Sequence, residues 1–313
     1  MKRPPQKRPF HFFFRGNIEK ILQISMIFNF ESFMANLSFC LLFLTMLFYW
    51  IAIGLPETSK IILTSRISMI LANLALFLLL VLRWKDSGHF PLSNLYESLI
   101  FLSWSLTAIQ IFLDNAPRNK MTNTTNFSFI DAFATFSLPQ EMQKTSALVP
   151  ALQSNWLVMH VTIMILSYAA LICGCLLSIA FLIITRVSPL NPFLMNGYSE
   201  STNSEVSQIF PALSSFSLKL AKNLDNLSYR VLGIGFPLLT IGILSGSVWA
   251  NEAWGSYWSW DPKETWALLT WLVFAIYLHT RLTKGWQGKK PAIIAAFGFI
   301  VVWICFIGVS AVL

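Results

Sequence analysis

The sequence predicts an all-α fold, a polytopic bundle of about seven transmembrane helices with an outward-facing, tryptophan-rich loop. Composition is the first observation: 55% of the residues are hydrophobic, only 12% are charged, and the mean hydropathy is +0.62. The second is that several nearly uncharged apolar stretches approach the roughly 20 residues that a helix needs to cross a bilayer. These stretches are continuous and do not alternate, which favours helices over a transmembrane barrel.

The apolar stretches place the spans in order along the chain. We expect them at roughly 33–55, 67–84, 95–113, 156–184, 231–250, 265–282 and 292–313. Loops rich in serine and asparagine are predicted at 114–155 and 185–230. An apolar segment at 127–138 is too short to span and contains Asp131. If it did cross the membrane, everything before it would change sides.

Two regions are expected on this basis. A basic N-terminal extension covers 1–32, and a transmembrane domain covers 33–313 and contains the loop region 249–266. Three interpretations of the extension stay open: a targeting segment, a disordered tail, or translation from upstream of a true start at Met26.

The net charge of +8 follows from membrane topology and does not indicate nucleic-acid binding. Basic residues collect on the inner side of membrane proteins. With the N-terminus inside, 16 of the 22 lysines and arginines fall in inner segments and six in outer ones. This places the loop at 251–264 outside and the loop around His89 inside. Membrane lipid is therefore an expected partner, and nucleic acid is not.

An aromatic string follows the fifth span: Trp254-Gly255-Ser256-Tyr257-Trp258-Ser259-Trp260-Asp261. Its four large rings, Trp254, Tyr257, Trp258 and Trp260, are candidates for ligand contact. Tryptophan and tyrosine also anchor spans at membrane interfaces. However, six of the twelve tryptophans fall between residues 249 and 271, which is more than anchoring requires. Such a density favours a platform for a planar ligand, because aromatic faces stack on π-systems.

The residues after the string predict where the next helix begins. Asp261-Pro262-Lys263-Glu264 has the pattern of an N-cap, a proline at the first helical position and a glutamate at the third. Asp261 is therefore expected to cap the helix, and as the last residue of the string it is also a ligand candidate.

Histidines supply the candidate metal ligands. His160 lies near the outer end of its span, on the side predicted for the aromatic string. This position is equally consistent with an iron ligand and with a packing residue. His279 lies near the inner end of the span that follows the string, as an interfacial cap or as a ligand at a second site. His89 has the character of a structural loop residue.

The sequence gives little support for redox, phosphate-binding, nucleophilic or proton-transport chemistry. The four cysteines, Cys40, Cys173, Cys175 and Cys305, fall in apolar runs without C-x-x-C spacing, which indicates packing residues. No phosphate-binding glycine loop or Ser/His/Asp arrangement stands out. Apart from Glu97 the spans are poor in acids, whereas proton-coupled transporters usually carry more carboxylates there.

Together with three flanking stretches, the aromatic string resembles the WWD-domain haem-handling family. These stretches are Phe90–Ser98, Leu138–Met142 and Ala147–Trp156. The resemblance runs from about residue 67 to 309 and is greatest to the CcsA type of the system II haem lyase, in its land-plant plastid form. The CcmC and CcmF types share the tryptophan motif but not the flanking stretches.

This resemblance implies a subunit of holocytochrome c synthase in the thylakoid membrane, with the loop in the lumen. Its cofactor would be b-type haem, held non-covalently for attachment to the C-x-x-C-H motif of apocytochromes c of the cytochrome f and cytochrome c6 types. A CcsB-type membrane protein (Ccs1 in plastids) would be its partner. In the family's pattern His160 matches the first external axial ligand and His279 matches a ligand within the membrane.

One departure from the family's pattern stands out. The family's second external histidine lies in a tail after the last span, whereas no histidine follows His279 in this sequence. An incomplete sequence, an unedited translation and a degenerating gene are the open explanations. Two further functions stay open as well: a CcmC-like haem chaperone, which works without the partner, and a polytopic transporter or assembly factor that binds no haem.

Overall fold

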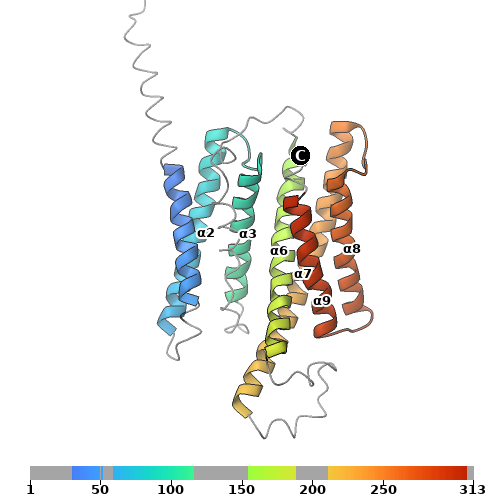
Figure 1. Cartoon of the computed structure of the whole chain (residues 1–313). Coiled ribbons are helices and arrows are strands. Elements are labelled where there is room, and N and C mark those ends of the chain that lie inside the picture. Colours follow the sequence, from blue (N-terminus) through green and yellow to red (C-terminus); the bar gives the residue numbers. More distant parts are fainter. Residues whose placement is uncertain (1–29, 50, 52–58, 116–153, 188–210, 309–313) are drawn as a thin grey trace, which may run out of the picture.

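Throughout the described residues the regular structure is helical, which confirms the all-α prediction (Figure 1). The structure is a computed structural model, and it describes residues 30–49, 51, 59–115, 154–187 and 211–308. The helices are Phe30–Tyr49, α2 (Ser59–Ser87), α3 (Leu95–Asn115), α6 (Asn155–Val187), α7 (Pro211–Trp254), α8 (Pro262–Leu282) and α9 (Lys289–Trp303), which η5 (Ile304–Gly308) continues as a π-helix.

Each of the seven predicted spans corresponds to one of these helices. Among the described residues, six helices are long and apolar enough to cross a membrane. The seventh, α8, falls outside that set because its tryptophans, threonines and His279 lower its hydropathy. It nevertheless joins the same two ends of the bundle as α7 and α9, against which it packs (Figure 1). The described part of the first helix starts at Phe30, which falls inside the expected extension, whereas Met26 and the segment 127–138 lie outside the described residues.

The prediction of a loop at 185–230 is wrong for its second part, because α7 already begins at Pro211. The segment is polar in composition but amphipathic in pattern. Its buried apolar positions, Ala221, Leu224, Leu227 and Val231, recur every three or four residues, while Lys222, Asn226 and Arg230 on the other face are exposed. This is the periodicity of a helix with one buried face.

Helix α6 lies at the centre of the bundle and packs against α3 on one side and against α7 and α9 on the other (Figure 1). Its contact with α7 is close because small residues line it. A Cβ atom built on Gly174 would lie 2.6 Å from Cγ of Leu232, and Ser228 donates a hydrogen bond of 2.8 Å to the Gly174 carbonyl. Small residues and interhelical hydroxyl bonds of this kind are typical of packing in membranes.

The direction of the first three helices differs from the prediction. Helices α3 and α6 run parallel, so that the start of α3 lies at the same end of the bundle as the start of α6 and the aromatic string (Figure 1). We call this end, which carries Trp254–Asp261, the tryptophan-loop end. The loop around His89 lies there too, so the expectation that it occupies the other side is wrong. The described chain therefore leaves at one end of the bundle after Asn115 and re-enters at the other end at Ser154.

Basic residues remain unevenly divided between the ends after this correction. In the described part of the chain, three lie toward the tryptophan-loop end: Arg83, Lys85 and Lys263. Ten lie toward the opposite end: Lys60, Arg66, Arg186, Lys219, Lys222, Arg230, Arg281, Lys284, Lys289 and Lys290. The asymmetry that positive-inside topology requires is therefore present among the described helices.

Candidate functional site

A cavity of about 610 Å³ lies at the tryptophan-loop end. Five parts of the chain line it: the segment that leads into α3 with its first turn, the first turns of α6, the end of α7 with the following loop, the start of α8, and η5. Its size is within the range of about 300–1,000 Å³ that is usual for small-molecule sites. Of the predicted site residues, the cavity brings together His160, Trp254, Tyr257, Trp258 and Asp261.

The loop that carries the rings has two left-handed backbone positions. Gly255, at φ 75°, ends α7, and its N–H donates to the Asn251 carbonyl over 2.9 Å. Trp260 has φ 60°, which a residue with a bulky side chain rarely adopts. Conformations of this kind cost about 1–3 kcal/mol and persist where the surroundings hold them. The backbone conformation that presents the rings is therefore strained, and the surrounding contacts must stabilise it.

The tryptophans pack in two perpendicular pairs. Trp258 and Trp260 have ring centroids 6.0 Å apart and an interplanar angle of 86°, and Trp249 and Trp254 have 6.1 Å and 85°. Because perpendicular rings cannot both lie flat on one planar ligand, each pair offers one ring for stacking. Trp258 lines the cavity and is half-buried, whereas Trp260 is 70% exposed, is not part of the cavity wall and supports Trp258 edge to face.

The start of α8 confirms the predicted cap. Asp261 has an extended backbone, and its Oδ1 accepts a hydrogen bond of 2.8 Å from the N–H of Glu264, with Pro262 at the first helical position. The return contact differs from a standard capping box. Glu264 Oε2 accepts from the N–H of Ser259 over 2.7 Å, and its Oε1 lies 3.3 Å from the Ser259 hydroxyl. The carboxylate of Glu264 thus holds the segment between Trp258 and Trp260 against the helix start.

Replacing Glu264 by alanine is expected to loosen the loop without unfolding the bundle. The change removes the acceptors of two hydrogen bonds at an exposed site, so the expected loss of stability is about 1 kcal/mol. Limited proteolysis within 255–260 should become several-fold faster. Glu252→Ala is the control, since it removes an exposed carboxylate from the last turn of α7. Equal proteolysis of the two variants would contradict the role given to Glu264.

His160 lies on the first turns of α6 with its ring fixed by α7. Its Nδ1 is 2.7 Å from the carbonyl oxygen of Gly242. A carbonyl only accepts, so Nδ1 carries the proton and Nε2 keeps its lone pair. A histidine whose second nitrogen donates to a backbone carbonyl is the arrangement typical of metal ligands. A Cβ atom on Gly246 would lie 2.5 Å from the ring, so the imidazole fits only because position 246 is glycine.

Several cavity residues were not predicted as site residues. Trp249 has its indole Nε1 buried without a hydrogen-bond partner in the described part of the chain. Cys305 lines the cavity and lies 3.3 Å from the hydroxyl of Tyr168, and Met164 contributes a thioether to the same wall. Met164 and Cys305 belong to apolar runs, where sequence offers no signal for them. Trp249, at the start of the tryptophan cluster, could have been found.

His279 does not join this cavity. It lies on α8 toward the opposite end of the bundle, with Nδ1 3.3 Å from the hydroxyl of Thr283. Its side chain is exposed on a helix face that also exposes Leu272 and Ile276. Any site at His279 is therefore separate from the cavity at the tryptophan-loop end.

Comparison with known proteins agrees with this geometry. A family described as "Cytochrome C assembly protein" matches residues 92–313. Proteins described as "Cytochrome c biogenesis protein CcsA" are 50% identical in both Microcystis aeruginosa and Marchantia polymorpha. In each case the match covers 90% of this chain and 94% of the relative.

A solved structure shares the fold. "Cytochrome c Heme Lyase CcmF" superposes with a TM-score of 0.62 at 16% identity, over 88% of this chain and 46% of that one. The residues that line the cavity, from Leu92 to Phe306, all fall within the matched region. The chain belongs to the CcsA family of cytochrome c biogenesis proteins and acts in cytochrome c maturation.

Proposed function

We propose that this protein holds haem, as cargo and without a covalent bond, in the cavity at the tryptophan-loop end, and delivers it for attachment to apocytochromes c. The observation that carries the proposal is His160. Its Nδ1 is committed to the Gly242 carbonyl, which leaves Nε2 available to iron at the wall of a cavity of about 610 Å³.

The cavity suits a flat ligand with an apolar body and polar edges. Trp258 and one ring of the Trp249–Trp254 pair supply aromatic faces, and Met164 and Phe306 supply apolar contacts. Asp261 and Lys263, at the start of α8, place polar groups at the rim. Haem itself supplies the two vinyl groups to which cysteine thiols of a C-x-x-C-H motif add. The chain's residues bind, orient and shield the cargo.

The sidedness and partners of the proposal follow from charge and family. Ten of the described basic residues lie toward the opposite end and three toward the tryptophan-loop end, which supports an outward-facing loop. In the thylakoid membrane of a plastid this would be the lumenal side. A CcsB-type protein (Ccs1) is the proposed partner. His279, exposed on α8, is proposed as a ligand of a second, membrane-side site completed by that partner.

The test is the haem spectrum of the full chain, purified in detergent with and without the CcsB-type partner. Wild-type protein is expected to show a Soret band, and His160→Ala should lose most of it, because no other described histidine lines the cavity. His279→Ala is the matched control and should keep the haem bound at the tryptophan-loop end. Wild-type protein without haem would instead support a transporter or assembly factor. Activity without the partner would support a CcmC-like chaperone.

A further inference from the structure

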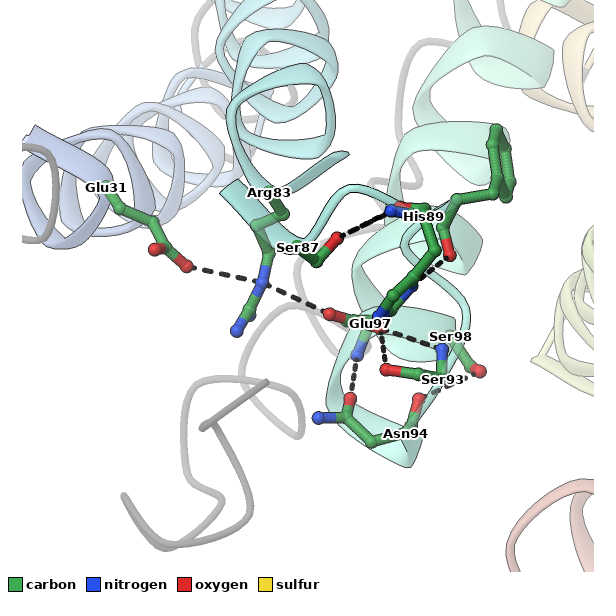
Figure 2. A network of polar contacts seen from close by, with 9 residues as sticks. Glu31, Arg83, Ser87, His89, Ser93, Asn94, Glu97 and Ser98 are labelled. Atoms are coloured by element: carbon green, nitrogen blue, oxygen red, sulfur yellow. Dashed lines mark hydrogen bonds and ion pairs between the residues drawn. The ribbon is translucent and has the colours of Figure 1, made fainter. Parts of the chain in front are cut away.

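One wall of the cavity is built by residues around the start of α3, which we call the α3 wall: Leu92, Ser93, Asn94, Leu95 and Ser98. Helix α3 begins here with its own cap. The N–H of Glu97 donates to Asn94 Oδ1 over 2.9 Å. In return, Glu97 Oε2 accepts from the N–H and the hydroxyl of Ser93, over 2.8 and 2.7 Å (Figure 2). The Glu97 carboxylate, which does not itself line the cavity, thus fixes the position of Ser93 in the wall.

The same carboxylate is joined to two other helices. Nε of Arg83, on α2, lies 3.5 Å from Glu97 Oε1 and 3.2 Å from Oε1 of Glu31, on the first helix (Figure 2). The side chains of Arg83 and Glu97 are 2% and 0% exposed. The Arg83 guanidinium also lies over the Tyr96 ring, 4.8 Å from its centroid. Charges buried this deeply are retained only when they remain paired, so the three helices hold one another in register here.

We propose that Glu97 and Arg83 are positioning residues for haem binding, which set the shape of the α3 wall from outside the cavity. This inference rests on the proposed function. It extends the site beyond residues 92–313, where the cytochrome c assembly family is matched, because Arg83 and Glu31 precede that region. The first helix and α2 thereby act on the cavity through Glu97, although Glu31 and Arg83 do not line it.

The opposite end of the same three helices provides a matched comparison. Asp114, near the end of α3, accepts a hydrogen bond of 2.9 Å from the hydroxyl of Tyr49 on the first helix. Arg66, on α2, donates to its backbone carbonyl. Asp114 is 6% exposed and lies far from the cavity wall. Loss of this carboxylate disturbs the packing of the same helices without touching the α3 wall.

The experiment compares Glu97→Ala and Glu97→Gln with Asp114→Asn in the full chain, purified with the CcsB-type partner and titrated with haem. Glu97→Ala is expected to weaken haem binding about tenfold, because Ser93 loses the carboxylate that fixes its place in the wall. The Soret maximum at saturation should match the wild type, because His160 is unchanged. Glu97→Gln keeps an acceptor for Ser93 but loses the charge that pairs with Arg83, so it should lie between Glu97→Ala and the wild type.

Asp114→Asn should bind haem within about twofold of the wild type even if thermal unfolding shows it to be as destabilised as Glu97→Gln. Equal loss of haem in Asp114→Asn and Glu97→Gln would overturn the proposal in favour of a general packing role. Wild-type affinity in Glu97→Ala would overturn it directly. These results are distinct from failure of the proposed function, in which the wild type itself shows no haem that depends on His160.

Discussion

Replacing Gly246 by alanine is expected to remove most of the haem that the purified protein retains, although the variant leaves every candidate ligand in place. The added Cβ atom would lie 2.5 Å from both Cε1 and Nδ1 of His160, so the imidazole must move. That movement breaks the bond from Nδ1 to Gly242, which fixes both the tautomer and the direction of Nε2. We expect haem affinity to fall about tenfold or more, measured by titration of the Soret band.

Gly233→Ala is the control for this variant. Gly233 lies in the same helix, α7, but a Cβ atom there meets no atom within 4 Å. The substitution should leave haem binding unchanged and stabilise the helix by up to about 1 kcal/mol. Overpacking in Gly246→Ala costs about 1–3 kcal/mol, so thermal unfolding must show that the variant remains folded. Wild-type affinity in folded Gly246→Ala would show that the position of His160 does not matter for haem.

The double variant Trp258→Ala/Trp260→Ala is expected to lose haem and, in cells, to mature c-type cytochromes poorly. Trp258 offers the stacking face and Trp260 supports it, so the loss of one aromatic contact, on the order of 0.5–1.5 kcal/mol beyond its buried area, corresponds to roughly a two- to thirteenfold weaker affinity. The single variants should differ. Trp258 lines the cavity and Trp260 supports it edge to face, so Trp258→Ala should cost more.

The variant Trp286→Ala tests whether the tryptophan loop acts as a haem platform or as a membrane anchor. Trp286 lies in the loop between α8 and α9 at the opposite end, with Nζ of Lys284 and Lys290 5.7 and 5.5 Å from its ring centroid. This is the environment of an interfacial anchor. Its loss should leave haem content and cytochrome maturation unaffected. If it lowers both as much as the double variant does, the tryptophan loop is an anchor and not a platform.

The helices with long aliphatic runs could be predicted closely from the sequence. Span 95–113 became Leu95–Asn115 and span 156–184 became Asn155–Val187. The first part of α7 could not be recognised by composition, because its lysines, serines and asparagines conceal an amphipathic period around Ala221 and Leu224. Where packing against a neighbour supplies the stability, composition alone identifies a helix poorly.

The candidate site was predicted in part for a similar reason. Tryptophan and membrane histidine are rare enough that the loop and His160 stand out, and the Asp261 cap follows from spacing. The α3 wall could not be assigned to the site, because counting alternate spans put it on the other side of the membrane. Only the parallel course of α3 and α6 brings Ser93 and Ser98 to the cavity that His160 lines.

The order in which the cavity's walls occur along the chain has a consequence for biosynthesis. Leu92 belongs to the first wall to emerge from the ribosome, and Cys305 and Phe306 belong to the last. A nascent chain in which α9 has not yet been inserted therefore has His160 and the tryptophan loop but an open side. The complete cavity exists only once α9 and η5 are in place, so under the proposed function haem would be loaded after these residues have been synthesised.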